Sequence, residues 1–363
     1  MVYRVIGLMS GSSLDGLDIA FVHFHENGGK WTYEIIAADC YPYDKEWEQR
    51  LKNATHLNAH DYELLHSEYG HYLGKKINQF IDHHNLNHQV SLISSHGHTT
   101  FHEPEKLLTC QLGNGAAIAA ETKLPVVTDL RSLDVAFGGQ GAPIVPIGEK
   151  LLFHDYDYFL NIGGIANLSV RDGESISAFD VCPANRVLNM LAEEKGLSFD
   201  EDGNLASAGK INEGLLEELN SLEYYSLPNP KSLDNNFGTD TVFPIIKSFN
   251  IKTEDALRTY VEHICFQIKT AVNFPPNVNR QLLITGGGAF NNFLIKRLEE
   301  VFITSGLELK IVVPEENVVK YKEALIMGLI GILRWRQEYN VLSSVTGAKK
   351  NSIGGALWMG TEA

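Results

Sequence analysis

The residues with the clearest chemical potential lie in a turn near the amino terminus, Ser10-Gly11-Ser12-Ser13-Leu14-Asp15-Gly16-Leu17-Asp18. Glycine lets a ligand approach the backbone, successive turn N–H groups can form an anion nest, and hydroxyls add donors. Such a turn suits a polyphosphate better than a sugar ring. An ordinary Gly/Ser hairpin with acidic solvent contacts is the alternative that this turn alone leaves open.

Two later stretches repeat this arrangement. Asp157 to Val170 reads as a strand, a Gly163-Gly164 turn and a second strand, and Leu282 to Leu298 reads as a strand, three glycines and a helix. A helix that opens after glycines is a natural anion site, because its first N–H groups lack partners. The repetition predicts a duplicated domain. The motifs GxxxxGK[ST] and GxGxxG are absent from the sequence, which excludes a P-loop or dinucleotide fold.

A candidate general base lies in the segment AFDVCPANRVLN. We expect Asp180 to end a strand and Pro183 to open the following helix. A carboxylate at a helix amino terminus stays ionised easily and can accept a proton from a reacting group. A structural helix cap is the other interpretation of Asp180, and the segment alone does not separate the two.

Further polar candidates lie in two predicted loops. SSHGHTTFHEP carries His96, His98 and His102, and without a supporting carboxylate or cysteine pattern it favours hydrogen bonding to a substrate over metal binding. We therefore assign no metal site to protein side chains. Arg131 follows a predicted strand, which is a usual place for ligand contacts, and a surface pair with Asp134 is the alternative.

Composition limits the function classes. The chain has 363 residues, 44% hydrophobic and 21% charged, which is typical of a globular protein of about two domains. The net charge of -15 argues against a nucleic-acid partner. Four cysteines without a CxxC pair indicate reduced thiols, and the sequence offers neither a signal-peptide core nor an apolar run long enough for a membrane span. We expect a cytoplasmic protein that does not associate with membranes.

Hydrophobic periodicity and turn-forming residues predict the positions of the helices, strands and loops. Residues 222–240, rich in proline and asparagine, read as a loop that could form a mobile flap. Residues 1–137 form the predicted first domain, rejoined by about 340–363, and residues 138–339 form the second. The expected strands are Val5–Met9, Leu17–Phe24, Tyr33–Cys40, Val90–Ser94 and Pro125–Thr128; the expected helices are Asp61–Asn85, Gly113–Glu121, Pro143–Phe153, Glu254–Asn273, Asn291–Ser305 and Lys320–Tyr339. We expect the last helix to cross between the domains, with a close-packing face of Ala324, Met327, Gly328 and Gly331.

Taken in order, the motifs resemble those of anhydro-N-acetylmuramic acid kinases. They are MSGSSLDGLD, SHGHTTFHEP, VVTDLRSLDVAFGGQGAP, LNIGGIANLS, FDVCPANRVLN, GGGAFNNFL and KEALIMGLIG. That family belongs to the actin-like superfamily of sugar kinases. The resemblance implies a two-domain α/β fold of duplicated ribonuclease H-like units, with ATP in the interdomain cleft.

The resemblance also implies roles for single residues. Asp180 matches the catalytic aspartate, and the substrate-binding candidates are His96, Arg131, Asn185 and Glu323. The ATP- and phosphate-binding candidates are Gly11, Ser12, Ser13, Leu14, Asp15, Gly16, Leu17, Asp18, Asn161, Gly163, Gly164, Gly286, Gly287 and Gly288. ATP and Mg²⁺ are the implied cofactors, a small anhydro amino sugar is the implied partner, and the family suggests a homodimer.

The implied reaction opens 1,6-anhydro-N-acetylmuramic acid with water and phosphorylates its 6-oxygen. The product, N-acetylmuramic acid 6-phosphate, belongs to cell-wall (peptidoglycan) recycling. Asp180 would take the proton of the water, as the base does in an inverting glycosidase. A kinase of a different sugar and a catalytically silent actin-like nucleotide-binding regulator are the alternatives.

The chain departs from the family pattern in three motifs. FDVCPAN stands where the family has FDTGPGN, so Val181, Cys182 and Ala184 replace threonine and two glycines. SHGHT replaces SHGQT, and KSLDNNFG replaces KSTGREYF, which keeps Lys231 but removes an arginine and a glutamate. These changes concern the sugar and the catalytic side more than ATP binding.

Overall fold

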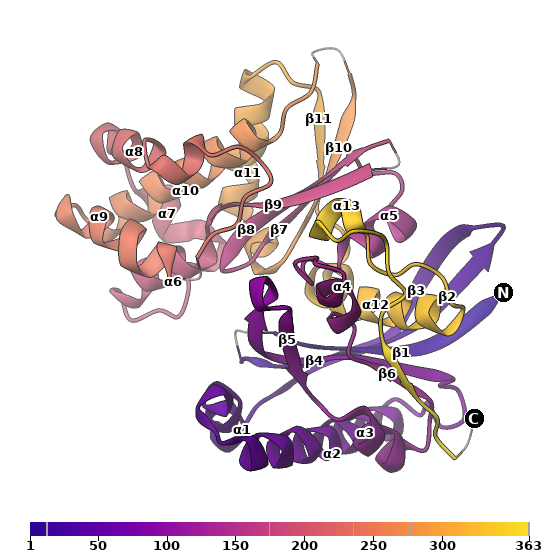
Figure 1. Cartoon of the computed structure of the whole chain (residues 1–363). Coiled ribbons are helices and arrows are strands. Elements are labelled where there is room, and N and C mark those ends of the chain that lie inside the picture. Colours follow the sequence, from indigo (N-terminus) through magenta and orange to yellow (C-terminus); the bar gives the residue numbers. More distant parts are fainter. Residues whose placement is uncertain (12–13, 174, 235, 276–277, 362–363) are drawn as a thin grey trace. The chain divides into compact units, whose positions relative to one another are not determined.

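The computed structural model describes residues 1–11, 14–173, 175–234, 236–275 and 278–361. The chain divides into two compact units (Figure 1). Unit 1 comprises Met1–His154 and Tyr321–Ala363, and unit 2 comprises Asp155–Lys320. Residues 138–154 and 321–339, which the sequence analysis placed in the second domain, therefore cluster with unit 1.

Unit 1 is built on a mixed sheet with the strand order β12-β6-β4-β1-β2-β3, to which β5 adds beside β4. β1, β2 and β3 pair antiparallel, whereas β4 lies parallel to both β1 and β6. Residues 5–8 of β1 are all buried, because helices cover both faces of this strand. The strands are β1 Val2–Ser10, β2 Gly16–Asn27, β3 Lys30–Pro42, β4 Leu92–Glu103, β5 Leu108–Leu112, β6 Val126–Thr128 and β12 Ala356–Trp358.

Three helices of unit 1, α1, α2 and α3, form an apolar core with one face of this sheet. Leu65, Tyr69, Leu73 and Ile77 of α2 repeat at helical spacing and are buried in that core. Asn58 caps α2 by accepting a hydrogen bond from the Asp61 N–H. The helices are α1 Lys45–Lys52, α2 Ala59–His83, α3 Gly115–Thr122, α4 Ser132–Ala136, α5 Pro146–Leu152, α12 Glu316–Trp335 and α13 Ser343–Thr346.

Small residues seat α12 against the other face of β1. A Cβ atom on Gly7 would lie 1.9 Å from the Ala324 carbonyl oxygen and 2.7 Å from the Gly328 nitrogen. One on Gly331 would lie 2.5 Å from Ser94 Cβ. The close-packing face predicted from the sequence is therefore real at Ala324, Gly328 and Gly331. The boundary between the units falls within α12, before Tyr321.

Unit 2 repeats the strand topology of unit 1. Its sheet has the order β11-β10-β7-β8-β9, with β7, β8 and β9 antiparallel and with β7, β10 and β11 parallel. The series β3-β2-β1-β4-β6 of unit 1 has the same order and directions, which confirms the predicted duplication and the α/β class. The strands are β7 Tyr158–Ile162, β8 Ile165–Asp172, β9 Ser175–Pro183, β10 Arg280–Thr285 and β11 Leu309–Val312.

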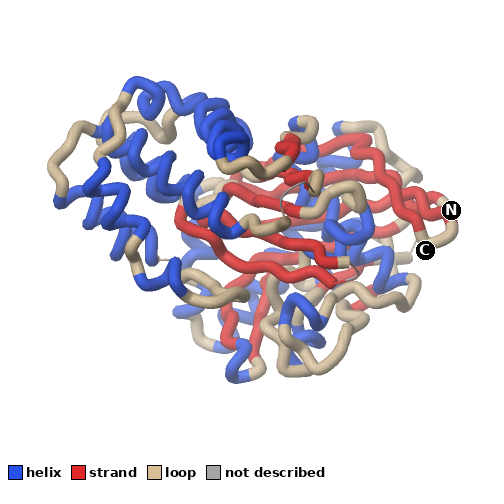
Figure 2. Tube along the Cα trace, turned by 90° about the horizontal axis from the view of Figure 1, so that it is seen from above, coloured by secondary structure: helices blue, strands red, loops and turns tan. Residues whose placement is uncertain are grey.

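Most helices of unit 2 gather to one side of these strands (Figure 2). Leu160, Ile162 and Leu168 of the sheet pack in one core with Leu257 and Ile264 of α10. The helices are α6 Asn185–Glu193, α7 Asn204–Ala208, α8 Glu213–Asn220, α9 Phe243–Ser248, α10 Thr253–Ala271 and α11 Asn292–Thr304.

Two local expectations were wrong. SSHGHTTFHEP is largely not a loop: its first ten residues, 94–103, belong to β4, where β5 pairs with residues 98–103 and satisfies backbone groups there. Pro183 does not open a helix, because it ends β9, and α6 begins at Asn185 with Ala184 as its N-cap residue.

The segment 222–240 is partly regular. It contains a short 3-10 helix, Glu223–Ser226, and runs into a π-helix, Phe237–Val242, and both precede α9. Its stretch at 231–233 hydrogen-bonds to β9. Within the described ranges, no helix combines the length and the apolar character needed to cross a membrane.

Candidate active site

The amino-terminal turn joins β1 to β2 as predicted. Leu17 pairs with Ser10, and Asp18 with Met9, so the turn is the tip of a hairpin. Ser12 and Ser13 lie outside the described residues. Gly16 is required by packing, since a Cβ atom there would lie 2.7 Å from Cys40 Sγ and 2.9 Å from the Tyr41 carbonyl oxygen.

A buried network of hydroxyl groups holds the first residue of this turn in place. Ser10 Oγ accepts a hydrogen bond from the Tyr43 hydroxyl at 2.8 Å and lies 3.2 Å from His98 Nδ1. The Tyr43 hydroxyl also lies 2.6 Å from that of Tyr69, which is fully buried. Burial lowers the pKa of His98 to about 4, so the imidazole is neutral at physiological pH. His98 therefore acts as a neutral hydrogen-bonding partner of the turn's first residue.

Asp18 has an unusual protonation equilibrium. Burial raises its pKa to about 6; the hydrogen bond with Cys40 opposes the shift, and the charges of Asp15 and Glu323 add to it. The same surroundings raise the pKa of the Cys40 thiol to about 12, with burial the largest cause. A cation beside Asp18 would favour its ionised form. The turn thus presents a carboxylate that is suited to a positively charged partner.

Arg131 is held by His96. Arg131 Nε donates to His96 Nε2 at 2.8 Å, and His96 Nδ1 donates to the Gly97 carbonyl oxygen at 2.9 Å. Burial, with the Arg131 charge as the next cause, lowers the pKa of His96 to about 3, which matches the neutral tautomer that these two bonds require. Both ring nitrogens of His96 are engaged, so in unit 1 His96 orients the guanidinium.

Glu323, on α12, lies in the electrostatic neighbourhood of Arg131 and Asp18. Burial lowers the pKa of Arg131 to about 10, and the Glu323 charge opposes that shift. Burial raises the pKa of Glu323, whereas the Lys322 and Arg131 charges lower it. In unit 1, Arg131 therefore contacts His96 directly, and the charge of Glu323 influences the pKa values of both Arg131 and Asp18.

Arg131 and Asp134 do not form the surface ion pair that was the alternative prediction for them. Asp134 is buried and accepts hydrogen bonds from the Gly141 N–H and the Thr346 hydroxyl, both at 2.8 Å.

The remaining histidine candidate, His102, has a polar neighbour of its own: its Nδ1 lies 3.2 Å from Thr109 Oγ1. The side-chain atoms of Asp39, His83 and His84 that could bind a metal lie within 4.8 Å of one another. Asp39 Oδ2 already accepts a hydrogen bond from His84 Nε2 at 2.6 Å.

A buried ion pair next to Glu323 supports the fold of unit 1. Lys322 Nζ lies 3.0 Å from Glu149 Oε1, and both side chains are at most 5% exposed. We expect Lys322→Met to lower the free energy of unfolding by ~3–5 kcal/mol, because Glu149 loses its buried counter-ion. Chemical denaturation measures this change. Lys320→Met, which breaks the exposed pair with Glu316 on the same helix, is the control and should cost under ~1 kcal/mol. Equal effects of the two substitutions would contradict the expectation.

In unit 2 the sheet aligns polar residues in one row. Asn161 of β7 pairs with Asn167 of β8, and Asn167 pairs with Asp180 of β9. Directly paired residues point to the same face of a sheet, and neighbouring strands lie ~4.8 Å apart. Thr285 of β10 continues the row beside Asn161, and its buried hydroxyl has no hydrogen-bond partner among the described residues. This polar row lies on the face opposite the apolar core.

The glycines near this row leave the backbone accessible. A Cβ atom on Gly164 would meet nothing closer than 3.9 Å, and one on Gly163 nothing closer than 3.5 Å. Gly286 has a φ of +81°, and a Cβ atom there would lie 2.6 Å from Asn161 Oδ1. Gly286 therefore requires glycine for its conformation, whereas the space beside Gly164 is open to a ligand.

Asn185 connects the two glycine turns of unit 2. Its Nδ2 donates to the Ile162 carbonyl oxygen at 3.0 Å, and its N–H donates to the Gly163 carbonyl oxygen at 3.0 Å. It also lines a pocket of about 510 Å³ with Gly287 and Gly288. The exposed rings of Phe199 and Phe290 border the same pocket. Asn185, predicted as a sugar ligand, thus lies beside the predicted nucleotide-binding glycines.

The segment after the three glycines differs in detail from the predicted helix start. Residues Gly287–Phe290 form one 3-10 turn, and α11 begins at Asn292. Asn291 Oδ1 accepts from the Leu294 N–H and caps α11. The pocket therefore lies at the 3-10 turn and the α11 cap, beyond the carboxyl end of β10, where ligands of α/β sheets usually bind.

Asp180 lies in the interior of β9 and caps no helix. Its N–H donates to the Lys231 carbonyl oxygen, and its Oδ2 accepts from the Leu233 N–H, both at 2.9 Å. Burial raises its pKa above the ordinary value, and the Leu233 N–H opposes that shift. The structure thus removes the helix-cap interpretation and leaves a partly buried carboxylate in the polar row.

The substitutions in FDVCPAN face the core of unit 2. Val181, Cys182 and Ala184 are buried at 3%, 0% and 0% exposure and belong to its apolar cluster. Asp180 and Asn185 of the same segment stay outside that cluster. These departures from the family pattern therefore fill the core instead of lining the polar row.

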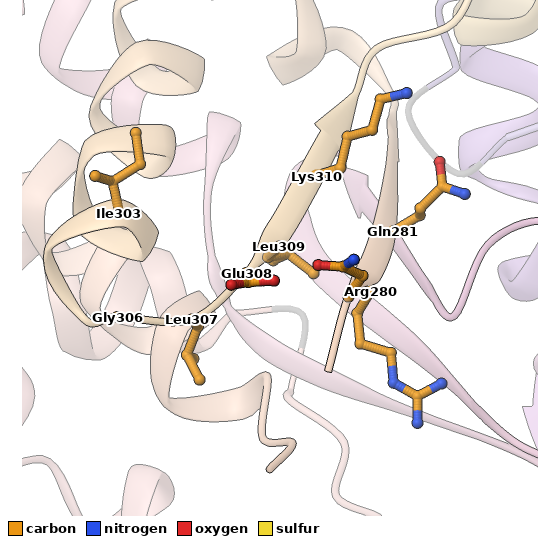
Figure 3. A pocket seen from close by; sticks show the side chains of 9 residues that line it. Arg280, Gln281, Ile303, Gly306, Leu307, Glu308, Leu309 and Lys310 are labelled. Carbon is orange, nitrogen blue, oxygen red and sulfur yellow. The ribbon is translucent and has the colours of Figure 1, made fainter. Parts of the chain in front are cut away.

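A second, larger pocket of unit 2 has a different position. Its volume is about 820 Å³, and Arg280, Gln281, Leu309 and Lys310 line it (Figure 3). These residues begin β10 and β11, whereas the glycine turn follows the end of β10. Because the strands are parallel, this pocket lies at the opposite edge of the sheet from the residues of the candidate site.

Comparison with known proteins supplies the family. The family model described as anhydro-N-acetylmuramic acid kinase matches residues 3–360. The proteins of that name from Hydrogenovibrio crunogenus and Haemophilus influenzae are 33% and 30% identical, over 97% of both chains in each case. The one from Vibrio parahaemolyticus is 36% identical over 82% of both chains. The chain belongs to the anhydro-N-acetylmuramic acid kinase family.

Proposed function

We propose that this protein is an ATP-dependent kinase that opens 1,6-anhydro-N-acetylmuramic acid with water and phosphorylates its 6-oxygen. The observation that carries the proposal is Asp180, a partly buried carboxylate fixed in a polar row of the sheet, in a chain that matches this family over residues 3–360. The product would be N-acetylmuramic acid 6-phosphate, a compound of cell-wall recycling, and the reaction would take place in the cytoplasm.

For the nucleotide, we assign the base to the pocket beside Gly287 and Gly288 in unit 2. Exposed aromatic rings at this pocket, Phe199 and Phe290, suit stacking against a purine. The backbones of Gly163 and Gly164 leave room for phosphate oxygens. The turn of unit 1 would contribute further phosphate contacts through Gly11, Ser12, Ser13, Leu14, Asp15, Gly16 and Leu17.

For magnesium, Asp18 is the best-suited donor in the described part of the turn. Mg²⁺ prefers carboxylate oxygens and keeps several waters, and it would neutralise charge on the phosphates. The raised pKa of Asp18, about 6, fits a group whose ionised form needs a nearby cation. The residues present therefore fit the ion.

For the sugar, we assign Arg131 and Glu323 as direct ligands. The guanidinium, oriented by His96, can pair with the lactyl carboxylate of a muramic sugar, and Glu323 can accept hydrogen bonds from its hydroxyl or amide groups. Asn185 is assigned to either ligand, because it bonds to the Ile162 carbonyl oxygen and lies beside the nucleotide glycines.

In the proposed reaction, Asp180 accepts one proton from a water whose oxygen bonds to the anomeric carbon. The bond between that carbon and the 6-oxygen breaks, and the 6-oxygen bonds to the γ-phosphorus as ADP leaves. No general acid is needed, since the leaving oxygen is captured by the phosphoryl group. General base catalysis contributes ~10²–10⁴ to such a rate, and alignment of the reactants supplies much of the rest.

The experiment that tests this function is a sugar panel assayed for ADP release and product mass. We expect ADP release to require the anhydro amino sugar, with one ADP for each phosphorylated sugar. Equal or faster turnover of another sugar would favour the kinase of a different substrate. ATP binding without turnover of any sugar would favour the silent regulator. A homodimer remains a proposal from the family, which sedimentation analysis can test.

A further inference from the structure

The backbone of residues 231–233 runs beside Asp180 and contacts it twice. The Lys231 carbonyl oxygen accepts from the Asp180 N–H, and the Leu233 N–H donates to Asp180 Oδ2, both at 2.9 Å. In addition, the Tyr224 hydroxyl donates to the Asp180 carbonyl oxygen at 2.7 Å. The main chain and the side chain of Asp180 are therefore both fixed by one surface segment.

This segment is itself anchored to the core of unit 2. Lys231 Nζ donates to the Tyr224 carbonyl oxygen at 3.0 Å and lies 4.5 Å from the centre of the Tyr224 ring. The Tyr225 hydroxyl lies 2.9 Å from Nε2 of His263, whose Nδ1 lies 2.8 Å from Asn220 Oδ1. His263 is fully buried on α10. Polar contacts thus tie Tyr225 to α10 and Lys231 to Tyr224, and the backbone from Lys231 to Leu233 reaches the carboxylate.

The contact with the carboxylate comes from the backbone, so it does not depend on the side chain at position 233. Leucine stands there where the family motif has threonine, and the following five residues of the motif differ as well. The N–H of any residue except proline can make this bond. The altered KSLDNNFG segment can therefore keep the function of holding Asp180 although its side chains have changed.

We propose that residues Lys231 to Leu233 are a positioning element for Asp180, in which the Leu233 N–H fixes Oδ2 and leaves Oδ1 to accept the proton of the attacking water. This inference rests on the proposed function, since it assigns Asp180 the role of general base. A hydrogen bond to the charged form of an acid favours that form. The Leu233 N–H thus offsets the burial that disfavours an ionised Asp180.

In the described part of unit 2, few charged side chains lie close enough to Asp180 to replace the effect of the Leu233 N–H on its pKa. The titratable side chains packed near Asp180 include the Tyr224 phenol, whose pKa is raised by burial and by the Asp180 charge, and the Lys231 amine, which is directed to backbone carbonyls. β8 contributes the uncharged Asn167 as the cross-strand partner. The N–H of Leu233 is therefore the contact whose removal should shift the titration of Asp180.

The test compares Leu233→Pro, which removes the N–H, with Leu233→Ala, which keeps it. For Leu233→Pro we expect the acid limb of the kcat–pH profile to move up by about one to two pH units, and kcat below that limb to fall ~10–100-fold. The dissociation constant for ATP should stay at the parental value. Leu233→Ala should keep the parental profile.

A profile of Leu233→Pro that superimposes on that of Leu233→Ala would overturn the inference. If Leu233→Pro does not fold, as judged by circular dichroism, a backbone ester at position 233 replaces the N–H by oxygen and keeps the leucine side chain. The same shift is then expected from the ester, and its absence again overturns the inference. A parent protein without sugar-dependent ADP release would instead refute the proposed function, so the two failures are distinguishable.

Discussion

Replacing Asp180 by asparagine should lower turnover by ~10²–10⁴ and leave ATP affinity nearly unchanged. Asparagine has the same shape and retains an oxygen that can accept the Leu233 N–H, so the segment at 231–233 should stay in place. Only the ability to take a proton from water is lost. Steady-state kinetics with the anhydro sugar, together with calorimetry of ATP binding, measures the two quantities separately.

Asp172→Asn is the matched control, because Asp172 ends the neighbouring strand β8 and is exposed. We expect this variant to keep parental turnover. An Asp180→Asn variant with more than about half of the parental rate would remove Asp180 from the chemistry. Since Asp180 does not cap α6, that result could not be explained by asparagine acting as an equally good helix cap.

Replacing Gly164 by valine should raise the dissociation constant for ATP by at least ~100-fold while the fold is retained. The nearest atoms to a Cβ at this position lie 3.9 Å away, on Arg186, so a Cβ atom meets no clash in the unliganded protein. It would occupy the space that we assign to phosphate oxygens. Calorimetry gives the affinity, and thermal unfolding without ligand checks the fold.

Gly164→Ala offers a graded comparison, since it adds one methyl group at the same place. We expect its ATP affinity to fall between those of the parent and Gly164→Val. The proposal would fail if Gly164→Val bound ATP as the parent does. A loss of thermal stability in Gly164→Val would instead show that the space is needed by the protein itself. Gly288 is unsuitable for this test, because a Cβ atom there would lie 2.3 Å from Ile162 Cγ2.

The sequence predicted the fold class because its turn signals and apolar runs are strong. The duplicated strand-turn-strand pattern corresponds to the shared strand order of the two sheets. The helices predicted around Asp61–Asn85, Glu254–Asn273 and Asn291–Ser305 are present with ends that differ by one or two residues. Long amphipathic segments with flanking caps are the part of a fold that local pattern determines best.

The errors concern pairings that local pattern does not encode. β4 extends through His96, His98 and His102 because β5, which the sequence analysis did not predict, pairs with it. Pro183 ends a strand because it pairs with Ile165 across the sheet, although proline before a helical pattern favours a helix start. Both outcomes depend on partners that are distant in the chain.

The candidate site was predictable by residue type but not by contacts. The motifs singled out Arg131 and His96, but only the structure pairs them and gives His96 an orienting role. The alternation in LNIGGIANLS could have placed Asn167 on the face of Asn161, since these residues flank a hairpin turn. The contact between Leu233 and Asp180 carries no such signal, because a backbone N–H is common to nearly all residues.

The most direct test of the coupled reaction is to run it in water labelled with heavy oxygen. We predict, in product analysed before anomeric exchange, one heavy oxygen at the anomeric carbon and none in the phosphoryl group or at its bridging 6-oxygen. That pattern requires water to attack the sugar and the sugar oxygen to attack ATP. Heavy oxygen in released phosphate, or a phosphorylated sugar that contains no added water, would contradict the account.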